Sequence, residues 1–262
     1  MNERPILQLR DVSKRYAGLD AVSGLNFSAV SGTITALIGP NGAGKSTTFN
    51  LISGLEQPTS GSIMFRGNDI TALSVHVRCP LGIARTFQTP KVFDHLTVCE
   101  NVMVGLHGRS RSGLLRSGMR LPGFLAEEQS IRDDAQRWLR FAGLEQLADR
   151  NAGALSFGEQ RALEFARAMA AKPELLLLDE PTSGLTPAET EAFAAKLMAI
   201  IREGVTVVIV EHDLPFITSV ADTVVVLAYG RKIYDGSVSS MRADAGVVEA
   251  YVGRPRKSSR DA

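Results

Sequence analysis

Short runs of apolar residues recur along this chain and predict the strands of a sheet. They occupy Ile6–Val12, Leu25–Val30, Thr33–Ile38, Gly61–Phe65, Leu175–Leu178, Val205–Val210 and Thr223–Ala228. The later runs alternate with helical patterns at Pro187–Arg202 and Leu214–Ala221. This alternation predicts an α/β fold with a mostly parallel sheet and helices on its faces.

The strand pattern stops between residues 89 and 154, where helical patterns replace it. Thr97–Val104 and Glu127–Ala142 have a helical pattern, and the Gly-, Ser- and Arg-rich stretch Gly108–Gly123 separates them as a loop. We therefore expect a helical lobe inserted into the sheet domain. The polar, basic residues 254–262 predict a frayed tail, with weak attraction to a membrane surface as the alternative.

Size and composition exclude several classes of protein. The 262 residues suffice for one large domain or one domain with a lobe, and 29 basic against 28 acidic residues leave a net charge of only +1. Such a charge balance produces no global field that would gather nucleic acid or anionic lipid. Cys79 and Cys99 cannot build a disulfide framework, which suits a reducing cytosol. The start lacks a signal pattern and no apolar run approaches the ~18 residues that span a bilayer, so we expect a soluble chain.

One loop points directly to phosphate chemistry. Residues 39–47 follow an apolar strand and match the pattern G-x-x-x-x-G-K-[ST]. Glycines let successive backbone N–H groups face one anion, and a helix that starts near Lys45 turns its positive dipole end toward the same anion. Lys45 is expected to reach the β- and γ-phosphates of ATP, and Ser46 to offer a hydroxyl to Mg²⁺; a plain Gly-rich turn is the alternative. The nucleotide-binding residues predicted here are Gly39, Pro40, Asn41, Gly42, Ala43, Gly44, Lys45, Ser46 and Thr47.

A second motif supplies the acids that a phosphate loop needs. The apolar strand Leu175–Leu178 ends in Asp179 and Glu180. Asp179 is expected to hold Mg²⁺, usually through water, and Glu180 to polarise the attacking water. An acidic pair that simply caps an exposed strand end is the alternative.

The segment Leu155–Gln160, Leu-Ser-Phe-Gly-Glu-Gln, precedes an Ala-rich helix expected at Arg161–Ala171 and resembles the L-S-G-G-Q signature of ATP-binding cassette (ABC) proteins. It departs from the commonest pattern in its third residue, which is Phe instead of Gly. Ser156 and Glu159 also fit a capping box at the start of a helix. The resemblance implies that this segment contacts the nucleotide held by the opposite subunit, through Ser156, Gly158 and Glu159.

Three further residues match the family in the same order along the chain. The resemblance implies that Gln88 contacts Mg²⁺ and water at the junction of the core and the helical lobe. It implies that His212 hydrogen-bonds near the γ-phosphate and that the ring of Tyr16 stacks on adenine. The alternatives are a surface glutamine before Pro90, a structural histidine and an edge-strand tyrosine.

The segment of residues 183–186 takes the place of the family's D-loop. Thr186 stands there where an acid or an amide is usual. With Pro187 and Glu189, it fits first a helix cap followed by a proline in the first turn. Cross-subunit signalling at this position is therefore left open.

The resemblance covers nearly the whole chain and implies the architecture of the family. It implies a P-loop NTPase core with a mixed, mostly parallel sheet, an antiparallel β subdomain and an inserted α-helical subdomain. The core is expected at about residues 1–88 and 161–235, the helical subdomain at about 89–160 and a C-terminal extension at 236–253.

A finer match involves the segments Gly82–Gln88, Val92–Asn101, Leu155–Arg167 and Val247–Gly253. These resemble the ATP-binding subunits of branched-chain amino acid uptake transporters, whose relatives import other small polar solutes. The resemblance implies an ATPase that pairs head to tail with a second ATPase subunit and binds two ATP molecules. It also implies two membrane permease subunits, an extracytoplasmic solute-binding protein, a place at the cytoplasmic face of the plasma membrane and no nucleic-acid partner.

Two other functions remain open at this point. One is a soluble ABC protein of ribosomes or DNA repair, although a single P-loop and the lack of a heptad run before the signature argue against it. The other is the ATPase of a lipid or lipopolysaccharide exporter. The solute itself is inferred only by analogy with the family.

An apolar cluster surrounds Gln88 in the sequence, with most of its residues after it. We expect this cluster to receive a short cytoplasmic helix from each permease, or else to pack within the helical lobe. Its residues are Phe87, Val92, Phe93 and Leu96.

Overall fold

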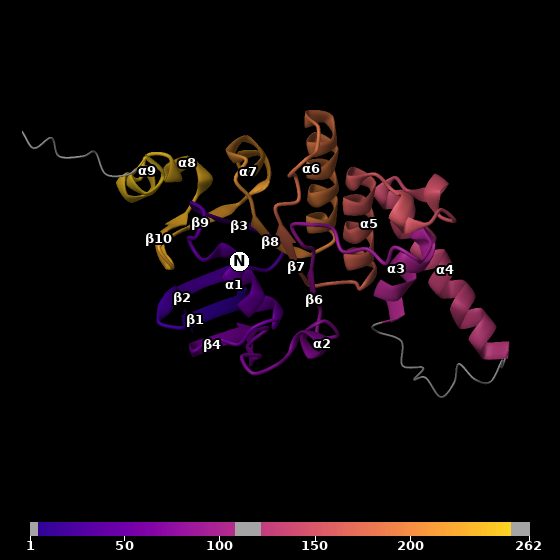
Figure 1. The fold of residues 1–262 in the computed structure, drawn as a ribbon, viewed down its shortest axis with the longest axis horizontal. Helices are drawn as coiled ribbons and strands as arrows, with labels where there is room; N and C mark the ends of the chain where they lie inside the picture. Colours follow the sequence, from indigo (N-terminus) through magenta and orange to yellow (C-terminus); the bar gives the residue numbers. More distant parts are fainter. Residues whose placement is uncertain (1–4, 108–121, 253–262) are drawn as a thin grey trace, which may run out of the picture.

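The structure, a computed structural model, describes residues 5–107 and 122–252. Its centre is a six-stranded sheet in the order β10-β9-β3-β8-β7-β6 (Figure 1). All neighbours in this sheet run parallel except β10, which pairs antiparallel with β9. The strands are β3 (Ile34–Ile38), β6 (Ile83–Arg85), β7 (Leu175–Asp179), β8 (Thr206–Val210), β9 (Thr223–Ala228) and β10 (Arg231–Gly236). The predicted α/β class with a mixed, mostly parallel sheet is confirmed.

A second sheet is entirely antiparallel, in the order β2-β1-β4-β5. Its strands β1 and β2 are each longer than the apolar runs predicted, because they form a hairpin in which Tyr16 still pairs with Leu19 across a tight turn. Polar residues continue the ladder there, so apolar periodicity alone cannot find its end. The strands are β1 (Pro5–Tyr16), β2 (Leu19–Val30), β4 (Ser60–Phe65) and β5 (Asn68–Asp69).

Helices cover the sheets and build the lobe. They are α1 (Lys45–Ser53), α2 (Val75–Arg78), α3 (Val98–His107), α4 (Pro122–Ala142), α5 (Phe157–Ala170), α6 (Pro187–Arg202), α7 (Leu214–Val220), α8 (Val238–Met241) and α9 (Ala245–Val252). Among the described residues, none of them combines the length and apolar character that a membrane crossing requires.

Some predicted helix bounds were wrong. Helix α4 begins at Pro122 and not near Glu127, and α3 continues to His107. Helix α5 begins at Phe157 and not at Arg161, because the capping box starts the helix directly after Ser156. Most of the predicted loop, residues 108–121, and the basic tail lie outside the described residues.

Consecutive side chains of the central strands point into two different cores. In β7, Leu176 and Leu178 pack with helices α3 to α7, whereas Leu175 and Leu177 pack with α1 and the antiparallel sheet. Both faces of the strand are therefore covered, which explains why all its residues are buried and why its sequence is continuously apolar.

The lobe is built from α3, α4 and α5, which pack on one another beside the large sheet (Figure 1). A row of aromatic rings joins it to the helices on the sheet, with centroid distances of 5.7, 6.3, 5.3 and 6.4 Å. Such contacts between large rings pack the lobe against helices α6 and α7. The rings belong to Trp138, Phe141, Phe165, Phe193 and Phe216.

One buried arginine closes the junction between α1 and the antiparallel sheet. Arg78 is fully buried, and its guanidinium group donates to backbone carbonyls alone. These carbonyls include two near the C-terminus of α1, those of Leu51 and Ile52, so Arg78 helps to satisfy groups at a helix end. The acceptors are Leu51, Ile52, Ile70, Thr71 and Leu73.

Candidate nucleotide site

The predicted phosphate loop connects β3 to α1 and requires glycine at two positions. Gly44 has φ of 101°, and a Cβ there would lie 2.5 Å from the carbonyl oxygen of Ala21. Gly39 has φ of 148°, and a Cβ there would lie 2.1 Å from the carbonyl oxygen of Leu227. No side chain fits at either distance, so the loop can lie this close to its neighbouring strands only with glycine.

Lys45 lies over this loop. Its Nζ donates to the carbonyl oxygens of Gly39, at 2.7 Å, and Pro40, at 3.0 Å. Burial lowers the pKa of Lys45, while the nearby Glu180 and Asp179 carboxylates act in the opposite direction. The ammonium group is thus held where a phosphate in the loop would meet it.

The loop borders a cavity of about 460 Å³. The cavity brings the phosphate loop together with Gln88 and Glu180, which lie far apart in the sequence. The predicted site residues outside its described lining are Tyr16, Gly39, Pro40, Ser156, Gly158, Glu159, Asp179 and His212. The lining residues are Leu19, Asp20, Ala21, Asn41, Gly42, Ala43, Gly44, Lys45, Ser46, Thr47, Gln88, Glu180 and Tyr229.

Glu180 and Gln88 contact each other directly at the edge of this cavity. Gln88 Nε2 donates to Glu180 Oε2 at 2.8 Å. The backbone of Glu180 has φ of 47°, a left-handed conformation that is costly for a residue with a side chain. Its N–H donates to the carbonyl of Val210 at 2.8 Å, which helps to hold it there. Strained backbone of this kind is common at functional sites.

Asp179 has quite different surroundings from the glutamate beside it. Its Oδ2 pairs with Arg85 Nη2 at 2.9 Å, and both side chains are only 9% exposed. Burial raises the pKa of Asp179, and the hydrogen bond from Arg85 opposes that rise. The prediction missed Arg85, although it lies in the segment Gly82–Gln88 that carried the family match. A pair of charges 94 residues apart leaves no periodic signal.

Tyr16 and His212 lie outside the cavity lining. The Tyr16 ring is 40% exposed, Lys14 Nζ lies 5.0 Å from its centroid, and its hydroxyl donates to Glu56. Burial, followed by Glu56, raises the pKa of Tyr16 to about 12. The side chain of His212 is 69% exposed at the end of β8, with its Nδ1 3.7 Å from the buried Glu211.

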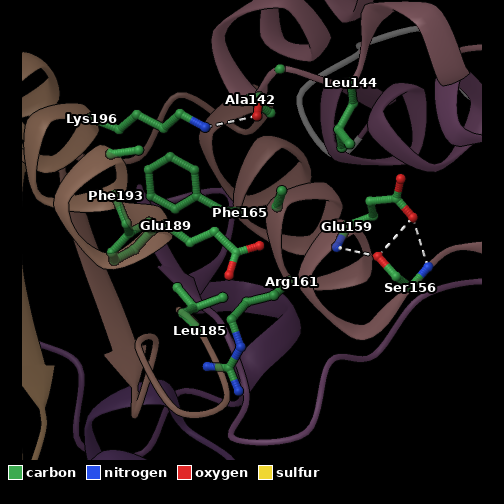
Figure 2. Close-up of a pocket in the computed structure, with 14 residues that line it drawn as sticks. Ala142, Leu144, Ser156, Glu159, Arg161, Phe165, Leu185, Glu189, Phe193 and Lys196 are labelled. Carbon is green, nitrogen blue, oxygen red and sulfur yellow. Dashed lines mark hydrogen bonds between the residues drawn. The ribbon is translucent and has the colours of Figure 1, made fainter. Parts of the chain in front are cut away.

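The signature segment lies at a second, separate cavity of about 360 Å³, between α5, α6 and the end of α4 (Figure 2). Glu159 Oε2 accepts from the N–H and hydroxyl of Ser156 at 2.7 and 2.8 Å, and Ser156 Oγ accepts from the N–H of Glu159 at 3.4 Å. The predicted capping box is confirmed. Ser156, Gly158 and Glu159 line this cavity and not the one at the phosphate loop, so the described part of one chain keeps the two segments predicted to bind nucleotide at separate cavities.

Thr186 builds a capping box of the same kind at the start of α6. Glu189 Oε2 accepts from the Thr186 N–H and hydroxyl, both at 2.7 Å, and Pro187 follows in the first turn. The helix-cap interpretation of Thr186 is therefore confirmed.

Comparison with known proteins decides the family. Residues 22–183 match the ABC transporter family. This chain belongs to the ABC transporter family. The high-affinity branched-chain amino acid transport ATP-binding protein BraF of Pseudomonas aeruginosa is 38% identical over 251 residues, which cover 95% of this chain and 98% of BraF. The protein LivG of Escherichia coli, which bears the same description, is 36% identical over 252 residues with the same coverage of each chain.

Solved structures agree with this assignment. A nucleotide-free ATP-binding cassette from an ABC transporter superposes with a TM-score of 0.83 at 31% identity, covering 96% of this chain and 100% of that one. A dimeric cassette in a post-hydrolysis state with ADP and Pi superposes with a TM-score of 0.78 at 26% identity, covering 88% and 98%. The fold is that of an ABC ATPase, a family whose cassettes bind nucleotide.

Proposed function

We propose that this ABC ATPase powers the import of branched-chain amino acids, or of a related small polar solute, through two partner permeases and an extracytoplasmic binding protein. The observation that carries the proposal is a phosphate-loop cavity shared by Lys45, Gln88 and Glu180 in a chain that matches amino acid transport ATP-binding proteins end to end. The names of these relatives favour an importer over a lipid exporter or a soluble ABC protein.

In this proposal, the loop of residues 39–47 binds the phosphates of ATP through its N–H groups and Lys45, and Tyr16 stacks on the adenine ring. Ser46, Gln88 and Asp179 hold Mg²⁺. Hydroxyl, amide and carboxylate oxygens are the donors that Mg²⁺ prefers, so these side chains fit the ion. When bound, Mg²⁺ neutralises charge on the phosphates.

Glu180 is the proposed general base. Glu180 is partly buried in the cavity wall, and Gln88 holds one of its carboxylate oxygens by the 2.8 Å hydrogen bond. Water placed between this carboxylate and a phosphate on Lys45 would lose its proton to Glu180. His212 would contact the γ-phosphate region from its exposed position at the end of β8.

The second half of each ATP site is proposed to come from a second ATPase subunit. The signature residues line their own cavity, apart from the phosphate loop, which supports a head-to-tail pair that brings one subunit's signature to the partner's loop. A ready-made anion site at the capped N-terminus of α5 fits this role.

The proposed permease contact is the groove between α2, β6 and the lobe, a cavity of about 330 Å³. Phe93, 48% exposed, stands at its rim with the exposed Leu55, Val75 and Val104. Val92, by contrast, packs against the core, so part of the predicted apolar cluster serves the lobe. A short permease helix with an apolar face fits this groove, and it would place the chain at the cytoplasmic face of the plasma membrane.

The proposal is tested by assembling the chain with permeases and a binding protein of this transporter class in proteoliposomes. ATP hydrolysis should rise when the binding protein is loaded with leucine, isoleucine or valine, and Lys45→Ala should remove the response. Stable assembly with a lipid-exporting permease, together with no response to any amino acid, would contradict it.

A further inference from the structure

Helix α5 presents three charged side chains, one per turn, to the segment that carries Gln88. Glu164 accepts from the N–H groups of Phe87, at 3.3 Å, and Lys91, at 3.0 Å. Arg167 donates to the carbonyl of Lys91, and Arg161 donates to the carbonyl of Gln88 at 3.0 Å. The signature helix thus binds this segment by four backbone groups.

Arg161 differs from Glu164 and Arg167, because it also contacts Glu180, the residue that follows β7. Its Nη1 donates to the carbonyl oxygen of Glu180, while its Nη2 holds Gln88. The fork of a guanidinium group suits such a two-carbonyl contact, which a lysine could not reproduce. Figure 2 shows the side chain of Arg161 beside Leu185, with its guanidinium group directed away from Lys196.

These contacts close a ring of hydrogen bonds. Arg161 binds the carbonyls of Gln88 and Glu180, and the side chain of Gln88 donates to the carboxylate of Glu180. The left-handed backbone of Glu180 is therefore held on both sides, by Val210 at its N–H and by Arg161 at its carbonyl. The Glu180 carbonyl also accepts from the N–H of Ser183 at 3.2 Å. Arg161 is therefore the side chain that, together with this turn hydrogen bond, opposes relaxation of the strained peptide.

The surroundings of Arg161 argue against a role in stability alone. Its side chain is 7% exposed, both of its terminal nitrogens bond to neutral carbonyls, and its Nε has no hydrogen-bond partner among the described residues. Burial lowers the pKa of Arg161. A buried charge of this kind carries a desolvation penalty, so its burial is by itself weak evidence for a stabilising role.

We propose that Arg161 is a positioning residue for hydrolysis, which fixes the Glu180 carboxylate and Gln88 relative to each other and ties both to the first turn of the signature helix. The inference rests on the proposed role of Glu180 as general base. Misplacement of a catalytic group by about 1 Å costs on the order of 10²-fold in rate. Arg161 touches no phosphate-loop residue by a hydrogen bond among those described, so nucleotide affinity should not depend on it.

The test compares Arg161→Met and Arg161→Lys with the full-length wild-type chain, using steady-state ATP hydrolysis and binding of a fluorescent ATP analogue. In Arg161→Met, kcat should fall roughly 10- to 100-fold while KM and analogue affinity stay within about twofold. Arg161→Lys should recover only part of the rate, since a single nitrogen lacks the planar fork with which two guanidinium nitrogens reach two separate carbonyls.

Arg78→Lys is the matched control, because Arg78 is a buried arginine that binds only carbonyls away from the site. It should lower thermal stability without changing kcat per nucleotide-binding molecule. The inference is overturned if the Arg161 variants keep the wild-type kcat per binding-competent molecule. It is also overturned if their kcat and their affinity for the ATP analogue fall together. If Arg161→Met does not fold, Arg161→Lys decides.

Glu180→Gln, measured in parallel, separates this inference from the proposed function. If Glu180→Gln is inactive and the Arg161 variants are fully active, only the positioning role is wrong. If Glu180→Gln itself turns over normally, the proposed general base is wrong and the positioning role falls with it.

Discussion

Asp179 and Glu180 are adjacent in the sequence, yet the fold gives their carboxylates different environments. Asp179 ends a fully buried strand and pairs with Arg85, whereas Glu180 turns into a left-handed conformation and faces the cavity beside Gln88. One carboxylate is thus held deep against a cation, and the other is accessible to water. This difference in environment supports the proposed role of Glu180 as the base.

At the residue scale, we predict that Glu180→Gln removes the base and leaves the phosphate contacts intact. Turnover of the assembled transporter should fall by ~10²- to 10⁴-fold. ATP should still bind, because Lys45 and the loop backbone are unchanged. Single-turnover hydrolysis and nucleotide retention measure the two effects, and turnover near the wild-type rate would rule out Glu180 as the base.

Capping decides where two functional elements begin. Helices α5 and α6 start with the same reciprocal box, built by Ser156 with Glu159 and by Thr186 with Glu189. Each box satisfies N–H groups that a helix start leaves unpaired. The start of helix α5, within the signature segment, is therefore fixed by side chains of that same segment.

At the element scale, we predict that Ser156→Ala and Thr186→Ala each lower the free energy of unfolding by about 1 kcal/mol. Chemical denaturation of the isolated chain would measure both. The control is Thr218→Ala on α7, an exposed site whose hydroxyl bonds to Leu214 within the helix and caps no helix start. If Ser156→Ala and Thr186→Ala are no less stable than Thr218→Ala, the two capping boxes contribute nothing to stability.

A further prediction at this scale concerns the groove beside the lobe. Phe93→Ala should cost more than ~1 kcal/mol of permease binding, since a half-exposed aromatic side chain at a groove is typical of an interface anchor. ATP binding and thermal stability should be unchanged. Met198→Ala, an exposed apolar residue on α6 outside the groove, is the control. Undiminished permease association in folded Phe93→Ala protein would exclude the anchor.

In the whole molecule, the phosphate loop and the signature lie at different cavities, and this separation determines what one subunit can do alone. Each ATP would contact the loop of one chain and the signature of the other. Hydrolysis would then require a dimer, and the closing of that dimer would transmit a conformational change to the permeases.

At this scale, we predict complementation between two inactive variants, Ser156→Arg and Lys45→Ala. A mixed dimer contains one intact composite site and one doubly defective site. An equal mixture should recover at most about a quarter of the wild-type rate if chains pair at random. Steady-state hydrolysis, with mixed dimers verified by differential tagging, gives the answer. No recovery despite verified mixed dimers would contradict the composite site.

The sequence by itself determined whatever is local. Both capping boxes are confirmed, and the loop of residues 39–47 connects a strand to a helix as predicted, because a few consecutive residues and the backbone between them are enough to specify each. The buried strands were found for the same reason. The start of α5 was still placed wrongly, at Arg161, although Ser156 caps the helix directly before Phe157.

Only the tertiary structure decided which of these pieces meet. Two contacts join segments that are many residues apart: the pair of Arg85 with Asp179, and the ring through Arg161, Gln88 and Glu180. The separation of the two cavities likewise follows from how distant segments are placed. Such contacts depend on strand order and helix packing. A single sequence carries no periodicity for them, because a guanidinium group binds any carbonyl that the fold brings within reach.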